Sequence, residues 1–435
     1  MMERKMKDSG IEWIGKIPET WEVLPHKRIM RKIKEICFNY NGEDIISLTT
    51  NGVIVRDLSA GGKMPTTFDG YQYVHPGNLL MCLFDIDVTP RCIGLIKDEG
   101  LTSPAYSQFK FLRSEAYAPY FDYLLRYMDD EKCLLHLSKN LRSSLTEEDF
   151  GIIYTVLPPL SEQQHIVKYL DTMCGEIDSL IALQEQMIEK LKAYKQSVIT
   201  EAVTKGLNPN AKLVPSGIDW IGEIPEHWII LPIKYVKSKE KNAFVDGPFG
   251  SNLKSEHFIE NGEVLVIESG YITTGKFVYK DFKTISLSHF ETIRRSECKA
   301  NDIIIAKIGA NYGMAGELPR LNKLSVVSGN SLKITLDNSK VLNSIFVNIM
   351  FCAKHNQGFI NLVQENAQPA LSLSGLNNFR IPVPPLSEQH SIASYLDSKC
   401  SDIDRLIALK QQKIASLKDY KKSVIYEAVT GKTEI

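Results

Sequence analysis

Two motifs occur twice in this chain, in the same order. The segment 9–21, SGIEWIGKIPETW, returns as 216–228, SGIDWIGEIPEHW. The segment 157–171, LPPLSEQQHIVKYLD, returns as 383–397, VPPLSEQHSIASYLD. The chain is therefore a tandem duplication, and both copies must build the same framework.

The segments between the motifs, 22–156 and 229–382, share almost no sequence. The motif offsets, 207 and 226 residues, show that the second segment is longer by 19 residues. A repeated framework that holds two unlike inserts is expected of a protein that recognises two different half-sites at a set separation.

Composition indicates an ordinary globular protein of two to four domains. The chain has 435 residues, of which 43% are hydrophobic and 24% charged, so it can bury sizeable cores. No stretch approaches the ~20 apolar residues of a membrane span. The first ten residues, MMERKMKDSG, lack the apolar core of a signal peptide. These observations predict a cytoplasmic protein.

Charge and cysteine content narrow the possible ligands. A net charge of −1 counts against a protein that coats nucleic acid with its whole surface, so any such contact must be local. None of the eight cysteines forms a C-x-x-C pair, so neither a zinc site nor a disulfide framework is indicated. We therefore expect no metal ion, and we expect the repeat-equivalent Cys174 and Cys400 to serve packing.

The segments that follow each LSEQ motif are predicted helices. From Glu176 to Lys205 the chain contains neither Pro nor Gly, and apolar residues recur at spacings of 4, 7, 3 and 7, which fits a helix and no strand. Each helix would span about 28 residues, or roughly 42 Å. The apolar stripes are Ile177, Ile181, Ile188, Leu191 and Val198 in the first copy, and Ile403, Ile407, Ile414, Leu417 and Val424 in the second.

The ends of these helices are also marked in the sequence. The Pro-Pro pair of each motif should end an extended segment, after which Ser161 or Ser387 can cap a short helix. Gly206 and Gly431 should end the long helices. A narrow apolar stripe requires a partner helix, and the nearest partner is the other copy, which predicts an antiparallel coiled coil.

The inserts have the pattern of mixed α/β globules. Short β-type runs separated by Gly, Asn, Asp and Pro occur at 53–55, 78–84, 264–267 and 302–308. Segment 78–84 faintly matches 302–308, and 140–160 matches 366–386, so the inserts should share a fold and differ in their loops. The predicted fold class is mixed α/β: two α+β domains and two long helices, related by a pseudo-twofold tandem duplication.

Known catalytic motifs are nearly absent. The segment 270–277, GYITTGKF, has the G-x4-G-K spacing of a phosphate loop, but Phe277 replaces the hydroxyl that must reach a magnesium ion. A β-turn is the better interpretation. No G-x-S-x-G, H-E-x-x-H or dinucleotide motif occurs, and no N/D-P-P-Y/F tetrapeptide that would hold a flipped base. The sequence thus predicts a protein that is not itself an enzyme.

Polar loops in both inserts are the candidate nucleic-acid contacts, because Arg, Lys, Asn, Ser and Thr side chains bond base edges and phosphates. The candidates of the first insert are Thr49, Thr50, Asn51, Arg56, Arg91, Lys139, Arg142, Ser143 and Ser144. Those of the second insert are Ser251, Asn252, Lys254, Lys307, Asn311, Tyr312, Asn330, Gln368 and Ser372. Residues of these types also dominate solvated turns, which leaves that alternative open for each loop.

Arg142 and Lys307 are the strongest of these candidates. Each lies in a polar loop beside small residues that let the backbone approach a duplex, such as Ser143 in one loop and Gly309 in the other. The alternative is that both side chains cap carbonyl groups or pair with nearby acids such as Glu147.

On these motifs, the chain resembles the specificity subunit of a type I restriction-modification enzyme. The resemblance rests on the repeated P-P-L-S-E-Q with its following Tyr-Leu-Asp, and on the long helix that ends in Y-K-x-S-V-I-x-E-A-V-T. It covers essentially the whole chain. The segments DGPFGSNLK and LFDIDVTPR are also similar to recognition-domain segments of that family.

The resemblance implies a division into four parts: a first target-recognition domain, 1–156; a helical spacer, 157–206; a second target-recognition domain, 207–382; and a second helical spacer, 383–435. Each recognition domain would bind one half of a bipartite, asymmetric sequence in double-stranded DNA. The spacers would dock two methyltransferase subunits. Domains at the ends of a helix pair of roughly 40 Å would contact the duplex about one helical turn apart.

The resemblance also implies restriction and translocase subunits in a larger assembly. S-adenosylmethionine, ATP and magnesium would be used by those partners, so no cofactor is expected on this chain. A system that only methylates DNA is an alternative within the family.

Two interpretations outside the family stay open. One is a self-contained nuclease or methyltransferase, which incubation of the pure chain with DNA and S-adenosylmethionine would reveal. The other is a coiled-coil adaptor with two peptide- or protein-binding heads. Absence of DNA binding even with methyltransferase partners present would favour the adaptor.

Overall fold

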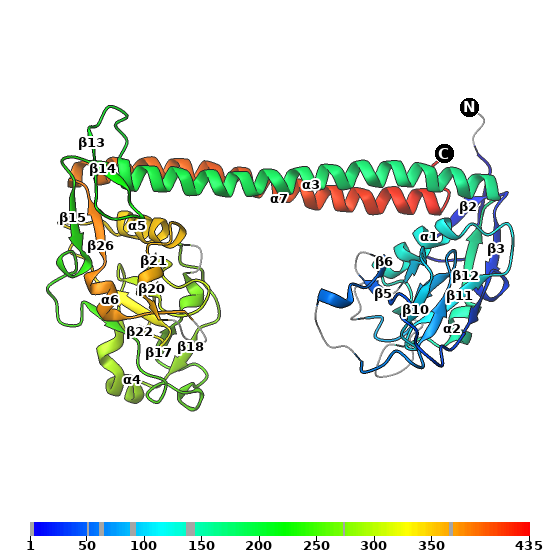
Figure 1. Ribbon diagram of the computed structural model, residues 1–435, viewed down its shortest axis with the longest axis horizontal. Coiled ribbons are helices and arrows are strands. Elements are labelled where there is room, and N and C mark those ends of the chain that lie inside the picture. The colour runs from blue at the N-terminus through cyan, green and yellow to red at the C-terminus, as the bar shows by residue number, and fades with distance from the viewer. Residues whose placement is uncertain are drawn as a thin grey trace. The chain divides into compact units, whose positions relative to one another are not determined.

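The computed structural model describes residues 4–49, 52–60, 65–87, 93–135, 144–272, 275–364 and 369–435. The chain divides into two compact units: unit 1 is Met1–Glu185 with Gln411–Ile435, and unit 2 is Gln186–Lys410. Each unit holds one insert, one copy of each repeated motif and part of both long helices, which are labelled α3 and α7 in Figure 1.

Both long helices are continuous. Helix α3 is Leu160–Lys205 and helix α7 is Leu386–Val429, with 46 and 44 residues, or about 69 and 66 Å. The predicted length of about 28 residues was wrong, because the helix continues through Gly175 toward the motif. A single glycine costs a helix only about 1 kcal/mol, which the packing of a long helix offsets.

The starts of the long helices correct a second prediction. The backbone amides of Glu162 and Gln163 both donate to the carbonyl oxygen of Pro159, and the equivalent bonds go to Pro385 in the second copy. The helix therefore begins directly after the Pro-Pro pair. Ser161 lies in the first turn of a long helix and does not cap a separate short one. Ser387 lies in the equivalent turn of α7.

Each unit contains a four-stranded antiparallel sheet of the same topology. In unit 1 the strand order is β4-β11-β8-β9, and in unit 2 it is β16-β23-β20-β21. The strands are β4 (Met30–Ile33), β11 (Ser107–Phe111), β8 (Leu79–Met81), β9 (Ile93–Leu95), β16 (Phe244–Asp246), β23 (Ser331–Ile334), β20 (Ile303–Ala306) and β21 (Ala315–Glu317). The faint match of 78–84 to 302–308 thus marks two equivalent strands, β8 and β20.

Further equivalent elements surround both sheets. Those of unit 1 are β1 (Met6–Asp8), β2 (Lys16–Pro18), β3 (Glu22–Pro25), β5 (Ile46–Thr49), β6 (Gly52–Val55), β7 (Gln72–Val74), β10 (Gly100–Thr102), α1 (Ala118–Asp130), α2 (Glu147–Ile152) and β12 (Tyr154–Leu157). Strand β3 pairs with β12, as β15 pairs with β26 in unit 2.

Unit 2 contains a second four-stranded sheet in the order β18-β17-β22-β19, and in unit 1 a parallel bridge between Ile45 and Leu101 joins β5–β6 to β7–β10. The remaining elements of unit 2 are β13 (Leu213–Pro215), β14 (Glu223–Pro225), β15 (Ile229–Pro232), β17 (Val264–Ile267), β18 (Lys283–Ile285), α4 (Leu287–Ile293), β19 (Glu297–Cys298), β22 (Leu324–Val327), α5 (Asn343–His355), β24 (Val363–Gln364), β25 (Ala370–Leu371), α6 (Leu373–Asn378) and β26 (Arg380–Val383). Helices α1 and α5 both have 13 residues, and α2 and α6 both have six.

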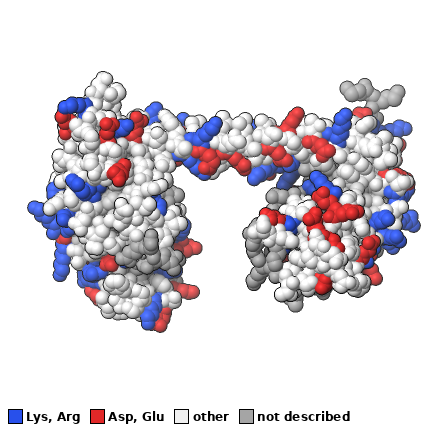
Figure 2. Space-filling view, in the orientation of Figure 1, with Lys and Arg blue, Asp and Glu red and all other residues white. Residues whose placement is uncertain are grey.

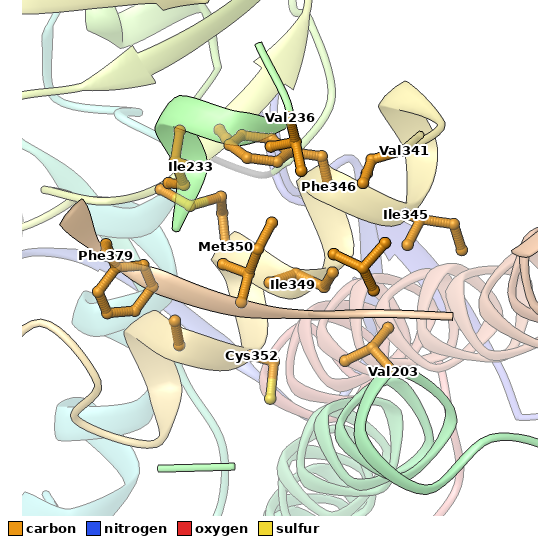
Figure 3. Close-up of a cluster of buried hydrophobic side chains, with 14 of the residues drawn as sticks. Val203, Ile233, Val236, Val341, Ile345, Phe346, Ile349, Met350, Cys352 and Phe379 are labelled. Atoms are coloured by element: carbon orange, nitrogen blue, oxygen red, sulfur yellow. The ribbon is translucent and has the colours of Figure 1, made fainter. Parts of the chain in front are cut away.

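The main core of each unit joins its sheet to its part of the long helices. In unit 2 the apolar side of α5, with Ile345 and Ile349, packs against Val203 of α3 and Ile233 of the turn after β15 (Figure 3). In unit 1 the equivalent core contains Phe121 of α1 together with residues of both long helices. The domain therefore cannot be separated from the helices without exposing its core.

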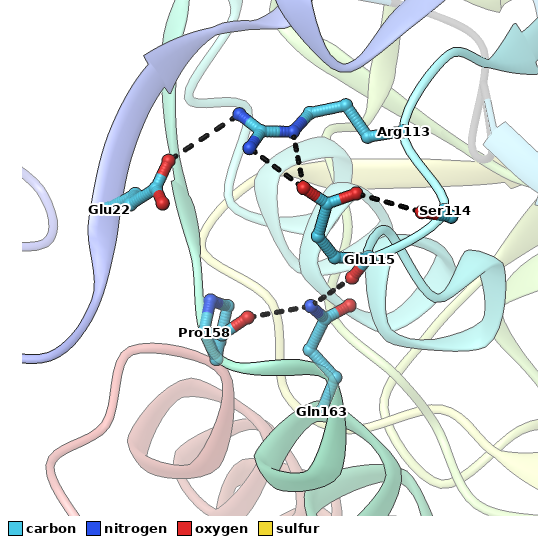
Figure 4. Close-up of polar contacts among 6 residues, drawn as sticks. All are labelled: Glu22, Arg113, Ser114, Glu115, Pro158 and Gln163. Atoms are coloured by element: carbon cyan, nitrogen blue, oxygen red, sulfur yellow. Dashed lines mark hydrogen bonds and ion pairs between the residues drawn. The ribbon is translucent and has the colours of Figure 1, made fainter.

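The glutamine of the repeated P-P-L-S-E-Q motif forms a buried hydrogen-bonded junction. The side-chain amide of Gln163 donates to the carbonyl oxygens of Pro158 and Glu115 at 2.7 and 2.8 Å (Figure 4). The side-chain oxygen of Gln163 accepts from the backbone amide of Tyr117. Gln389 makes the equivalent three bonds in unit 2. One fully buried side chain thus ties the helix start to two other segments.

The glutamate of the P-P-L-S-E-Q motif accepts a hydrogen bond from the last tryptophan of the other repeated motif. The indole N–H of Trp21 donates to Glu162 at 2.9 Å, and that of Trp228 donates to Glu388 at 3.0 Å. Because these bonds join the two repeated motifs inside each unit, the motifs are parts of one framework.

Within each unit, α3 and α7 lie antiparallel and exchange ion pairs at repeat-equivalent positions. Lys421 donates to both carboxylate oxygens of Asp178 at 2.7 Å in unit 1. Lys195 donates to Asp404 at 2.6 Å in unit 2. Of the ten predicted stripe residues, none is exposed. Ile177, Ile188, Val198, Ile403, Leu417 and Val424 are buried, and Ile181, Leu191, Ile407 and Ile414 are half-buried.

The ends of both long helices follow prediction. Gly206 directly follows α3 with φ of 74°, and Gly431 lies two residues after the end of α7 with φ of 70°. Such left-handed backbone favours glycine. Cys174 is buried and Cys400 half-buried, both as free thiols. In the described part of the chain, none of the helices combines the length and apolar character that crossing a bilayer needs.

Candidate nucleic-acid interface

Strand directions bring the polar loops of unit 2 to one edge of its sheet. Strands β16 and β20 both run antiparallel to β23, so they end where β23 begins. The loops 247–254 and 307–314 follow β16 and β20, and the loop 328–330 precedes β23. We call this the loop edge of unit 2. It gathers three predicted loops that are far apart in the sequence.

Backbone hydrogen bonds fasten these loops to each other. The amide of Gly247 donates to Ser331 at 3.0 Å, and the amide of Lys307 donates to Asn330 at 2.9 Å. A fourth predicted segment joins them, because the amide of Leu371 donates to the carbonyl oxygen of Lys307 at 2.9 Å. The loop edge is therefore a connected surface and not a set of independent turns.

Two cations share one carboxylate at this edge. Arg295 lies 2.5 Å from Asp246, and the ammonium of Lys307 lies 3.6 Å from the second oxygen of the same side chain. Lys307 also lies 5.9 Å from the ring centroid of Phe249. Lys307 therefore pairs with an acid in the structure without DNA, as the alternative interpretation predicted. With two cations for one anion, the cluster keeps a positive charge that a phosphate could neutralise.

Most other predicted residues of unit 2 have polar side chains open to a ligand. Exposed side chains are Ser251, Asn252, Lys254, Asn311 and Asn330, and half-buried ones are Lys307, Tyr312 and Ser372. Two of them also have structural partners. The hydroxyl of Ser372 accepts from the amide of Gly375 and caps α6, and the Tyr312 ring lies 3.2 Å from the ammonium of Lys354. Burial lowers the pKa of Lys354.

The corresponding edge of unit 1 is formed by the ends of β4 and β8 and the start of β11. The backbone amide of Leu145 donates to the carbonyl oxygen of Leu83 at 2.8 Å. The chain that follows 136–143 therefore lies beside the chain that precedes 88–92. The β5–β6 hairpin packs on β9, since a Cβ on Gly94 would lie 2.7 Å from Val53.

Three of the predicted DNA-contacting residues of unit 1 lie among the described residues. Thr49, Arg56 and Ser144 are half-buried, and the Thr49 hydroxyl donates to the carbonyl oxygen of Gly52 at 3.0 Å. The other predicted residues lie outside the described residues: Thr50, Asn51, Arg91, Lys139, Arg142 and Ser143 in unit 1, and Gln368 in unit 2.

The candidate residues chosen from the sequence did not include two residues that lie at the loop edge of unit 2. Phe249 lies inside a predicted loop, but the selection of polar side chains passed over an apolar one. Arg295 lies far along the chain, and only the fold brings it to Asp246. Basic and acidic residues are both present on the visible face of each unit (Figure 2), as the net charge predicts.

Comparisons with known proteins agree with the duplicated motifs. Residues 249–419 match the family described as the type I restriction modification DNA specificity domain. The MjaVIII type I specificity subunit of Methanocaldococcus jannaschii is 26% identical over 66% of this chain and 63% of its own length. The putative MjaX specificity subunit of that organism is 25% identical over 97% and 96%.

A solved structure shows the same fold. A chain from a study of assembly and conformational transition in a type I R-M system has a TM-score of 0.69, with 16% identity over 95% of this chain and 98% of that one. The matched residues and these relatives make the chain similar to the specificity subunits of type I restriction-modification enzymes, as its duplicated motifs predicted. It spans about two thirds of the length of the first relative and nearly all of the second.

Proposed function

We propose that this chain is the non-catalytic, sequence-specific DNA-binding subunit of a type I restriction-modification system. It recognises a bipartite, asymmetric target in double-stranded DNA and directs methyltransferase and restriction subunits to that target. The observation that carries the proposal is the equivalence of the two units: one sheet topology, repeated on one framework, bears different loops at the same edge. Unlike loops on equivalent edges suit two unlike half-sites.

The proposed division of work follows the motifs. Segments 1–156 and 207–382 act as target-recognition domains, and 157–206 and 383–435 act as spacers that form an antiparallel coiled coil. Within the recognition domains, the polar residues predicted above contact DNA. Lys307 is the leading candidate among the described residues, because its ammonium lies in a positively charged cluster at the loop edge.

The proposed partners are two methyltransferase subunits, which bind the spacers. Exposed apolar side chains occur on the helices at repeat-equivalent places: Leu180, Leu183 and Tyr420 in unit 1, and Leu406, Leu409 and Tyr194 in unit 2. Two equivalent apolar surfaces suit two copies of one partner. S-adenosylmethionine, ATP and magnesium act on the partner subunits, and the assembly works on DNA in the cytoplasm.

Exchange of one insert tests the proposal directly. Replacing 22–156 with the insert of a related protein should change one half-site of the methylated sequence and leave the other half-site and the spacing intact. Mapping methylated adenines in a strain that carries the exchanged chain measures this. Alteration of both half-sites would contradict independent recognition, and loss of all sequence preference with an intact assembly would contradict DNA recognition by this chain.

A four-residue insertion near Ser197 tests the spacer. One added helical turn lengthens α3 by about 6 Å, close to two base pairs, with little rotation. The expected target keeps both half-sites and gains a longer gap between them. An unchanged gap would show that the helices do not set the separation.

A further inference from the structure

Two phenylalanines are unusually exposed, and they occupy equivalent loops. The Phe38 side chain is 80% exposed and that of Phe249 is 67% exposed. Phe38 lies in the loop that follows β4, and Phe249 lies in the loop that follows β16. Strands β4 and β16 are the first strands of the two equivalent sheets. A single exposed apolar residue is ordinary in a protein, but one at the same place in two unlike inserts requires an explanation.

Strand register shows how close the equivalence is. Ile33 of β4 lies opposite Gln108, which also lies opposite Leu80 of β8. Val245 of β16 lies opposite Lys333, which also lies opposite Ile304 of β20. Ile33 and Val245 therefore correspond. Phe38 comes five residues after the first and Phe249 four residues after the second.

The loop of Phe249 is held against its neighbour by backbone contacts. A Cβ on Gly247 would lie 1.9 Å from the carbonyl oxygen of Ser328, and one on Gly329 would lie 2.7 Å from that of Pro248. Only glycine allows such an approach. The backbone beside Phe249 is thus fixed on the loop edge, while the ring itself stays exposed.

The loop of Phe38 is fastened on both sides of the ring. The amide of the buried Cys37 donates to Tyr71 at 2.8 Å, and the amide of Tyr40 donates to the carboxylate of Asp69 at 2.8 Å. Both units therefore present an aromatic ring from a secured backbone at the edge where the candidate DNA loops leave the sheet.

We infer that Phe38 and Phe249 are apolar wedges, each packing its ring into a base step of its own half-site. The inference rests on the proposed function. Apolar side chains inserted between base steps partly unstack them and bend the duplex. In unit 2 a cation lies beside the wedge, because Lys307 is 5.9 Å from the Phe249 ring centroid. Its ammonium is placed to hold a phosphate while the ring enters the stack.

Fluorescence of 2-aminopurine tests the wedge in the assembled methyltransferase. Duplexes that contain the mapped target carry this base at successive steps of each half-site. The wild-type assembly should raise fluorescence at one step in each half-site. Phe249→Ala should abolish one of these two signals and weaken binding about tenfold, and Phe38→Ala should abolish the other. Phe249→Leu, which keeps an apolar side chain, should retain much of the signal.

Tyr235→Ala is the matched control. This tyrosine is 56% exposed, and Lys237 two residues later pairs with Leu336, at the opposite end of β23 from the loop edge. It should change neither signal. All four variants change exposed side chains, so their melting temperatures should equal that of the wild type.

The outcomes separate the wedge from the proposed function. A wild-type assembly without target-specific binding would contradict the function itself. A wild-type assembly that binds its target, with unchanged affinity and fluorescence in the Phe249→Ala and Phe38→Ala variants, would overturn the wedge alone. Weaker binding without any unstacking signal in the wild type would also overturn it, because the rings would then contact base edges or methyl groups without entering the stack.

Discussion

The two units keep the same residues where the framework is buried and different residues where the loops are open. Gln163 and Gln389 make the same three hydrogen bonds, and the two motif tryptophans bond the two motif glutamates. Around this framework the inserts build one sheet order from unlike sequences. A hydrogen-bond junction specifies individual atoms, whereas a sheet needs only alternating apolar positions. Duplicated domains can therefore diverge in their ligands while the framework stays fixed.

The units also differ in size. Beyond the shared sheet, unit 2 has the second four-stranded sheet β18-β17-β22-β19, and unit 1 has the pairs β5–β6 and β7–β10, which a parallel bridge between Ile45 and Leu101 joins in the same arrangement. Strand β22 leads directly into the loop before β23. The second sheet of unit 2 therefore supports one loop of the loop edge.

The largest effect should come from the buried glutamines. Gln163→Leu leaves the carbonyl oxygens of Pro158 and Glu115 and the amide of Tyr117 without their partner. At about 1–3 kcal/mol for each of these three buried unpaired groups, the cost should be about 3–9 kcal/mol. Gln389→Leu should cost as much, but in unit 2. Chemical denaturation gives the free energy of unfolding, and hydrogen exchange shows which unit is loosened.

Gln164→Leu is the control for this pair, because Gln164 is exposed one residue away on the same helix. It should change the free energy of unfolding by less than about 0.5 kcal/mol. Equal exchange in both units after either glutamine substitution would show that the junctions do not act locally.

The next prediction is that the stability of the two units depends differently on pH. His26 is buried in unit 1, where its ring stacks on Phe150 and its Nε2 has no hydrogen-bond partner among the described residues. The equivalent residue of unit 2 is Ile233, which is also buried. Burial lowers the pKa of His26 from 6.5 to about 4. Unit 1 should therefore lose stability in acid through a group that unit 2 lacks.

The sign follows from proton binding. Between pH 6.5 and 4 the unfolded chain binds a proton at His26 and the folded chain does not, so the stability present above pH 6.5 is lost as the pH falls. The full loss should approach roughly 3 kcal/mol. His26→Ile should remove this pH dependence, as measured by denaturation of variant and wild type from pH 7.5 to 4. Parallel pH profiles of the two proteins would show that His26 does not titrate between these limits.

A smaller effect is expected at the proposed docking surfaces. Leu180→Ser with Leu183→Ser should weaken binding of one methyltransferase subunit by about 2 kcal/mol, or roughly 30-fold. Leu406→Ser with Leu409→Ser should weaken the other equally. Native mass spectrometry should then show complexes with one methyltransferase in place of two. Glu185→Ser, at an exposed charged position of the same helix, is the control. Two bound subunits in every variant would exclude these leucines from docking.

The sequence was sufficient for features that depend on local pattern. Apolar spacing predicted the long helices and their stripe, and Gly206 and Gly431 predicted their ends. Helix length was not predictable in this way, because whether Gly175 breaks a helix depends on the packing around it. Predicting the loop edge would also have required the strand order. No local pattern shows that 247–254, 307–314 and 328–330 leave the same edge, since that follows from pairing between distant strands.

The smallest effect should distinguish the two ion pairs of the helices. In unit 1 Asp178 has Lys421 as its partner, while in unit 2 Asp404 has Lys195 at 2.6 Å and also Lys276 at 3.6 Å. Lys421→Met should cost about 0.5 kcal/mol, since the pair is partly exposed and worth little in water. Lys195→Met should cost less, because Lys276 still neutralises Asp404. Double-mutant cycles with Asp178→Asn and Asp404→Asn measure both couplings, and added salt should reduce them further. Equal couplings in the two units would mean that Lys276 does not substitute for the lost lysine.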